Sequence, residues 1–125
     1  TFINSPKLLE SNFRFKTNKN IYFAGQITGV EGYIESAMSG IVAGISLARQ
    51  LSGKEELSFP NETMTGALIN HTIMATDNYQ PMGCNMGILP ALPERIKSKE
   101  DRYRALANIA ITALDQMLKS AQEVK

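Results

Sequence analysis

The chain has 125 residues, 43% of them hydrophobic, which is the composition of one ordinary soluble domain. Its 13 basic and 12 acidic residues leave a net charge of +1, which excludes a global basic field for nucleic acid or membranes. Cys84 is the single cysteine, so an internal disulfide is excluded. No apolar run has the ~18 residues of a membrane helix, and no signal peptide is visible. We therefore expect a cytoplasmic protein.

Two short strands are expected near the start of the chain. Residues 12–16 alternate polar and apolar, which is the period-2 pattern of a half-buried strand. Residues 21–24 form a short apolar run of strand-forming types, as in a strand buried on both faces, and this run stops at Gly25. Residues 17–20 between them indicate a turn.

A long helix is predicted over residues 31–51, with Gly53 as its C-cap. The helical spacing places these apolar residues on one face: Ile34, Ala37, Met38, Ile41, Ile45 and Ala48. Ser36, Gly40 and Gly44 recur every four residues and form a strip of small residues. Because each interior glycine costs ~1 kcal/mol relative to alanine, we expect another backbone to pack closely on this strip.

The rest of the chain is predicted to form two helices separated by an irregular loop. The first spans residues 62–75, with Asn61 as its N-cap. Residues 77–93 carry three prolines and two glycines among apolar residues, which indicates an ordered loop packed on a surface. Ser98 and Asp101 form a capping box for the final helix. Its apolar stripe is Tyr103, Leu106, Ala110, Ala113, Leu114, Met117 and Ala121, and Ile109 and Ile111 lie off that stripe.

The segment from which we expect chemistry is the glycine-rich turn between the strand at residues 21–24 and the long helix. A helix N-terminus carries unpaired N–H groups and a partial positive charge, which suit an anionic or carbonyl-bearing ligand. Gly25, Gly29 and Gly32 permit positive φ and allow a ligand to approach the backbone. On spacing alone, tight structural packing explains such a turn equally well.

The sequence of this turn resembles a known cofactor motif. Residues 23–36, Phe-Ala-Gly-Gln-Ile-Thr-Gly-Val-Glu-Gly-Tyr-Ile-Glu-Ser, with Gly40 and residues 43–45 behind them, resemble the C-terminal FAD motif of bacterial folate- and FAD-dependent tRNA (uracil-5-)-methyltransferases. Residues 78–82, Asn-Tyr-Gln-Pro-Met, with later Asn, Gly, Leu and Pro residues, also resemble that family, as does the stretch 1–6. The resemblance therefore covers nearly the whole chain.

A related flavoprotein family, which helps to install carboxymethylaminomethyl groups on the tRNA wobble uridine, has a similar Gly-Gln-Ile turn. That family typically has Asn-Gly-Thr where residues 28–30 are Thr-Gly-Val, and Glu-Glu-Ala where residues 34–36 are Ile-Glu-Ser. It remains a rival interpretation. A second rival is a non-catalytic helical RNA-binding module in which the glycine turn is only structural.

The resemblance implies an α/β fold that is predominantly helical by content, with short strands and three main helices. Residues 1–53 would be the C-terminal part of a Rossmann-like FAD-binding domain, and residues 54–125 a helical extension packed on it. The implied enzyme methylates C5 of a T-loop uridine in tRNA, with methylenetetrahydrofolate as carbon donor and FAD, reduced by NAD(P)H, as carrier and reductant. The implied FAD-binding residues are Gly25, Gln26, Thr28, Gly29, Val30, Glu31, Gly32 and Tyr33.

Two features of that family have no match in these residues. The Gly-x-Gly-x-x-Gly loop for the FAD pyrophosphate is absent, and Cys84 does not match the nucleophilic cysteine. The chain also begins at Thr1 without an initiator methionine. We therefore expect an inactive fragment without catalytic residues, whose partners are tRNA and the upstream part of the same polypeptide. Uncovered apolar helix faces make self-association of the fragment an additional expectation.

Several residues admit both a structural and a functional interpretation. Gln80, Met82 and Asn85 lie on the irregular loop and are the candidates for contact with folate or uracil. Tyr33 suits either the cover of a flavin or folate ring or core packing. Glu31 is explained by the helix dipole without catalysis, although the resemblance favours the cofactor site.

Three other features favour the structural interpretation. Cys84 has no basic neighbour, which favours a passive thiol. His71 has no second ligand at metal-binding spacing, so no metal site is expected. The basic run Arg95, Lys97, Lys99, Arg102 and Arg104 is diluted by acidic residues, which favours a solvated face over a phosphate contact.

Overall fold

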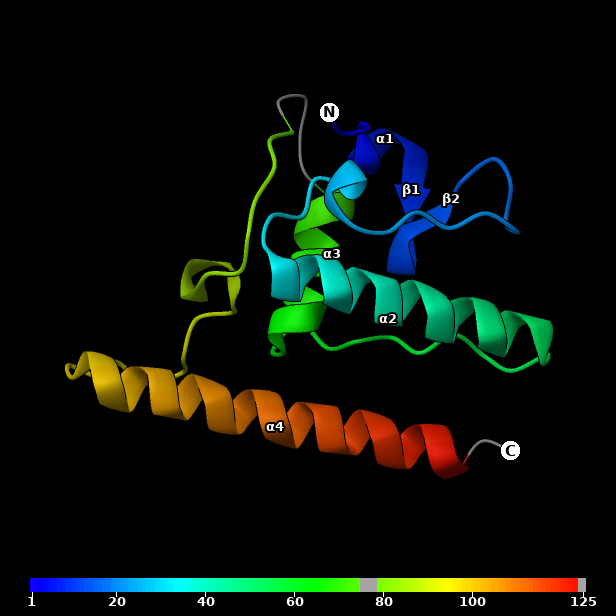
Figure 1. Ribbon diagram of the computed structural model, residues 1–125. Coiled ribbons are helices and arrows are strands. Elements are labelled where there is room, and N and C mark those ends of the chain that lie inside the picture. Colours follow the sequence, from blue (N-terminus) through cyan, green and yellow to red (C-terminus); the bar gives the residue numbers. More distant parts are fainter. Residues whose placement is uncertain (75–78, 124–125) are drawn as a thin grey trace. The chain divides into compact units, whose positions relative to one another are not determined.

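The computed structural model describes residues 1–74 and 79–123, which form two compact units. The first unit comprises residues 1–56 and 68–84, and the second comprises residues 57–67 and the chain from residue 85 onward. Both are mainly helical, and long unbroken helices, α2 (Tyr33–Leu51) and α4 (Lys99–Glu123), dominate the ribbon (Figure 1). None of the described helices combines the length and hydrophobicity that would span a membrane. The domain division expected at residue 53 stays a prediction.

The N-terminal segment folds into a short helix and a small antiparallel hairpin. Its elements are α1 (Ser5–Leu8), β1 (Leu9–Glu10), the 3₁₀ turn η1 (Ser11–Phe13) and β2 (Arg14–Phe15). Leu9 and Phe13 are fully buried and form the centre of this region. The strand predicted over residues 12–16 is confirmed only at Arg14 and Phe15, because Asn12 adopts a left-handed backbone (φ 61°) and places the residues before β2 in a turn.

The strand predicted to be buried on both faces over residues 21–24 does not form within the described part of the chain. Its only pairing there is an isolated antiparallel bridge between Tyr22 and Arg14. Ile21 is 41% exposed, and Ala24 is exposed as well. A strand becomes buried on both faces only when neighbouring strands and covering helices surround it, and among the described residues this run has one bridge to β2 on one side.

The predicted long helix is confirmed as α2 (Tyr33–Leu51), and Gly53 follows its C-cap with a left-handed backbone, as expected. The apolar stripe of α2 is not its buried face. The buried residues are small or of moderate size: Ser39, Val42, Ala43 and Ser46. Ile34 and Ile41, which belong to the stripe, are 81% and 62% exposed, as expected of an uncovered apolar face.

The strip of small residues on α2 also differs from its prediction. A Cβ added at Gly40 or Gly44 would meet no atom within 4 Å. Nothing in the described chain therefore packs closely on this strip. The face of α2 that is buried, with Ser39, Val42, Ala43 and Ser46, lies elsewhere on the helix, and α2 contacts η1 of the N-terminal region.

The second predicted helix is confirmed as α3 (Met64–Met74), although its N-cap was assigned wrongly. Thr63, not Asn61, caps it, because the Thr63 hydroxyl accepts a hydrogen bond from the amide of Gly66 at 2.9 Å. A Cβ at Gly66 would collide with the Pro60 carbonyl, so a glycine is required at this close approach. The predicted end of the helix, Ala75, lies outside the described residues.

The irregular loop and the last helix agree with prediction over the described residues. Between Tyr79 and Pro93 the chain is irregular except for the 3₁₀ turn η3 (Met86–Ile88). α4 (Lys99–Glu123) begins after Ser98, whose hydroxyl accepts from the Asp101 amide at 3.4 Å. Most of the predicted stripe is half-buried, but Leu114 is 37% exposed and Ile111, off the stripe, is 66% exposed.

Candidate functional site

The glycine turn between residues 25 and 32 has the backbone that its sequence predicts. Gly25 (φ 86°), Gly29 (φ 97°) and Gly32 (φ 109°) all have positive φ, a region that other residues rarely adopt. Between the first two lies the 3₁₀ turn η2 (Gln26–Thr28), and Gly32 is the N-cap of α2. The three glycines thus shape one continuous turn that delivers the chain into α2.

Buried hydrogen bonds hold this turn from the inside. The Thr28 carbonyl accepts from the Ser5 hydroxyl at 2.6 Å and from the Tyr79 hydroxyl at 2.7 Å. The Thr28 hydroxyl donates to the Gly25 carbonyl at 2.8 Å. Ser5 and Thr28 are fully buried and Tyr79 is 7% exposed, so these bonds are shielded from water.

The second turn of α2 supports the start of the glycine turn. The Ser39 hydroxyl accepts a hydrogen bond from the Gly25 amide at 2.7 Å and donates one to the Ser36 carbonyl at 2.7 Å. Ser39 is fully buried. A small residue on the inner face of α2 therefore fixes where the turn begins.

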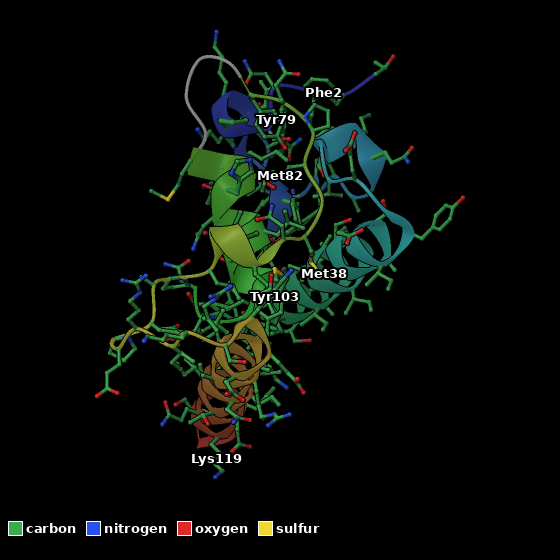
Figure 2. The ribbon with its side chains drawn as sticks, turned by 90° about the vertical axis from the view of Figure 1, so that its left-hand side faces the viewer. Phe2, Met38, Tyr79, Met82, Tyr103 and Lys119 are labelled. Atoms are coloured by element: carbon green, nitrogen blue, oxygen red, sulfur yellow. The ribbon has the colours of Figure 1, made fainter. Side chains whose placement is uncertain are left out.

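The irregular loop joins the turn from the other side. Val30 and Met82 form a parallel bridge, in which the Met82 amide donates to the Gly29 carbonyl at 2.9 Å and the Glu31 amide donates to the Met82 carbonyl at 3.0 Å. The same segment brings Tyr79 against Phe2, with ring centroids 5.9 Å apart (Figure 2). The structure therefore places Met82, predicted to contact folate or uracil, directly beside the predicted FAD-binding residues.

The other two loop candidates differ from Met82. Gln80 belongs to the same unit and is exposed. Asn85 belongs to the second unit, where its side-chain oxygen accepts from the Gly87 amide at 2.8 Å and caps η3. Asn85 thus has a structural function that the sequence did not predict.

The N-terminus of α2 is open. No side chain caps it, and no described residue accepts a hydrogen bond from the amides of Gly32, Tyr33 or Ile34. Tyr33 is 94% exposed, so the core-packing alternative for this residue is wrong within the described structure. The helix therefore presents unpaired N–H groups and an aromatic ring at the end of the glycine turn.

Acidic groups border this helix start. Glu31 is exposed, and the Glu35 carboxylate lies so close to Gly32 that an added Cβ would collide with it. Partial burial of the Cys84 thiol raises its pKa to about 11, and the charge and hydrogen bond of Glu35 add to this rise. The thiol is therefore protonated at neutral pH, which supports the prediction of a passive cysteine.

Sequence reasoning missed three residues that shape the site: Ser5, Ser39 and Tyr79. Ser39 lies on α2 outside the apolar stripe that the helical spacing indicated, and Ser5 lies twenty-three positions from its partner Thr28. The sequence around Ser39 or Ser5 has no pattern that predicts a long-range hydrogen bond. Tyr79 lies inside the Asn-Tyr-Gln-Pro-Met segment, so an aromatic hydroxyl within an apolar loop was the one available signal.

The remaining candidates do not form a site in the described structure. No group of three or more metal-binding side chains occurs among the described residues. The His71 ring lies 6.4 Å from that of Tyr79. In the basic run, Lys99 and Arg102 lie 5.5 and 5.7 Å from the centre of the Tyr103 ring, and Arg104 pairs with Glu100 at 3.3 Å.

Comparison with known proteins identifies relatives over nearly the whole chain. A family described as Glucose inhibited division protein A matches residues 1–55, which include the glycine turn and α2. Curated proteins named methylenetetrahydrofolate--tRNA-(uracil-5-)-methyltransferase TrmFO match a longer part of the chain than this family does. The relative from Staphylococcus carnosus is 50% identical over 117 residues, covering 92% of this chain and 27% of its own length.

Two further relatives carry the same name. The protein from Halalkalibacterium halodurans is 48% identical over 120 residues, which cover 95% of this chain, and that from Staphylococcus aureus strain Newman is 50% identical over 122 residues, which cover 96%. Both alignments cover 28% of the relative. The chain thus spans little more than a quarter of the length of these relatives. The resemblance predicted from the sequence is confirmed.

Proposed function

We propose that this chain, a homologue of the methylenetetrahydrofolate–tRNA-(uracil-5-)-methyltransferases over nearly all of its length, is the segment of such an enzyme that holds the flavin ring. The whole enzyme would methylate C5 of a T-loop uridine in tRNA. One observation carries the proposal: the uncapped start of α2, with three amides that have no acceptor among the described residues, follows a turn whose shape is fixed by buried hydrogen bonds.

The residues present fit FAD. The amides of Gly32, Tyr33 and Ile34 lack acceptors in the described chain, and the Ser36 hydroxyl oxygen is buried there without a partner. A Cβ added at Gly25 would meet nothing within 4 Å, so its side of the turn is open to a ligand. These groups would hold an oxygen-rich, negatively polarised ring edge.

FAD, once reduced by NAD(P)H, would supply the carrier for the methylene carbon of methylenetetrahydrofolate. The residues of this chain would orient it. The open amides of Gly32–Ile34 would stabilise negative charge on the ring, and the exposed Tyr33 would cover a flavin or folate ring. Met82 and Gln80 would border the folate or uracil, since Met82 pairs with Val30 in the turn.

We further propose that the upstream polypeptide packs on the outer face of α2 and supplies the rest of a Rossmann-like FAD-binding domain. Ile34, Ile41 and Ile45 are exposed on α2, as is Ile21 of the unpaired apolar run. The relatives are nearly four times as long as the aligned segment, so ample chain exists to cover these residues. Without it, the 125-residue chain would associate with itself through the same face.

The expression of the full-length protein tests the flavin proposal. A yellow protein with about one FAD per chain, detected by its visible absorption band, supports it, and a colourless protein that takes up no added FAD contradicts it. The non-catalytic RNA-binding alternative predicts the colourless result. A Gly32→Val variant of the same protein tests the place of the site, because valine rarely adopts the φ of 109° at this residue and would distort the helix start.

The identity of the modified base tests the enzyme class. Nucleoside analysis of tRNA from a strain lacking the gene should show loss of 5-methyluridine and normal carboxymethylaminomethyl bases. The opposite result would support the wobble-uridine flavoprotein instead. A tRNA substrate would be consistent with a cytoplasmic enzyme, and the single protonated cysteine fits a reducing compartment.

A further inference from the structure

Resting on the proposed flavin site, we propose that Tyr79 is a positioning residue for that site, and that it shares this function with Ser5. Neither residue was among the candidates that the sequence indicated. Their hydroxyls meet at one atom, the carbonyl oxygen of Thr28, inside the glycine turn. Thr28 lies four positions before Gly32, the N-cap of α2.

The geometry at the Thr28 carbonyl is a two-donor arrangement. The Ser5 hydroxyl lies 2.6 Å away and the Tyr79 hydroxyl 2.7 Å away, and both bonds are buried. A carbonyl oxygen has two lone pairs, so each donor occupies one of them. One donor ties the turn to the N-terminal segment, and the other ties it to the loop that carries Met82.

Tyr79 also explains why residue 29 is a glycine. A Cβ added at Gly29 would collide with the ring and the hydroxyl of Tyr79. The ring is held in turn by the edge-to-face contact with Phe2, seen in Figure 2. Tyr79 therefore fills the space beside Gly29 inside the turn, and no flavin can occupy that space.

This arrangement predicts redundancy between the two donors. Removing one hydroxyl leaves the Thr28 carbonyl bonded to the other, so the turn should relax only slightly. Removing both leaves a buried carbonyl without a donor, which carries the full cost of its lost hydration. The turn must then open towards water, and the amides of Gly32–Ile34 move with it.

Flavin affinity in the full-length protein measures this redundancy. We expect the FAD dissociation constant to rise roughly threefold in Tyr79→Phe and roughly threefold in Ser5→Ala. The double variant should exceed the product of the two and reach roughly 50-fold. Tyr22→Phe is the matched control, because it removes a hydroxyl that donates to Gln50 at 2.9 Å elsewhere in the same unit, and its FAD affinity should stay within about twofold of wild type.

The thermal midpoint of each apoprotein separates positioning from general stability. Tyr79→Phe and Tyr22→Phe should lower it by similar amounts, while only the former weakens FAD binding. Equal FAD affinity in the two variants, or a double variant no worse than the product of the singles, overturns the proposal. If the double variant does not fold, the comparison of the single variants decides alone.

Failure of the inference and failure of the proposed function give different results. A wild-type protein that binds no FAD would overturn both. A wild-type protein that binds FAD, with Tyr79→Phe, Ser5→Ala and the double variant all unchanged in FAD affinity, would leave the flavin site standing and remove Tyr79 and Ser5 from it.

Discussion

The glycine turn and the outward side of α2 belong to the same unit, yet their chemical groups are used in opposite ways. In the turn, buried donors and acceptors are paired inside the chain: Thr28, Ser39 and the Gly25 amide all have partners. On α2, the first amides have no acceptor among the described residues, and Ile34 and Ile41 are exposed.

This difference separates the groups that are paired within the chain from the groups that need a ligand or another segment to cover them. Hydrogen bonds that are completed inside the chain fix the shape of the turn without help. Polar and apolar groups left open cost free energy unless something else covers them. The open groups fall into two classes, amides at the helix start and isoleucines along the helix, which match a polar ligand and an apolar protein surface respectively.

The largest effect is expected from Gly29→Val. The substitution puts a branched side chain at φ 97° and drives it into Tyr79, so the turn cannot keep its shape. We expect at least about 3 kcal/mol of destabilisation in urea unfolding and loss of flavin from the full-length protein.

Gly53→Val is the control for this prediction. Gly53 has a similar left-handed backbone (φ 70°), but an added Cβ would meet nothing within 4 Å. Only backbone strain should appear, about 1–2 kcal/mol, with flavin retained. Equal losses for the two variants would show that Tyr79 does not press on Gly29.

The second largest effect concerns Tyr33, which lies at the open start of α2. Because its side chain is 94% exposed, Tyr33→Ala should leave the unfolding free energy of the 125-residue chain within about 0.5 kcal/mol of wild type. In the full-length protein it should weaken FAD or folate binding roughly tenfold, through loss of ring stacking. If Tyr33→Ala also lowered the unfolding free energy of the 125-residue chain by more than this, Tyr33 would have a structural function, which would contradict its assignment to ligand binding.

The features that could be predicted from the sequence are those that residues close in the chain determine. The positive φ of the glycines, the ends of α2 and the cap at Ser98 were predictable, because each depends on residues close in the chain. The buried face of α2 was not. Periodicity identifies an apolar stripe without telling whether this chain or another segment covers it, and here the described chain covers the small residues instead.

The third effect should change sign with chain length. Gly40 lies within α2 with open space around an added Cβ, so Gly40→Ala should stabilise the 125-residue chain by about 0.5–1 kcal/mol through helix propensity. In the full-length protein, where we expect another backbone to pack closely on the strip of Ser36, Gly40 and Gly44, the same change should destabilise. Thermal unfolding of both lengths measures the sign, and stabilisation at both lengths would show that nothing packs on Gly40.

The smallest effect concerns the reactivity of Cys84. Its pKa of about 11 keeps the thiol protonated, so alkylation by iodoacetamide should be slow at pH 8 and rise as the pH approaches 11. Glu35→Gln removes a negative charge beside the thiol and should shift this profile to lower pH. An unchanged profile would mean that Glu35 does not face Cys84.

The structure of the full-length protein with bound FAD is the most direct test of the central claim. The account predicts that atoms of the flavin ring or ribityl chain lie within hydrogen-bond distance of the amides of Gly32, Tyr33 and Ile34, with Tyr79 still bonded to the Thr28 carbonyl. It would be contradicted by a structure in which upstream side chains of the same protein occupy those three amides and the flavin lies elsewhere.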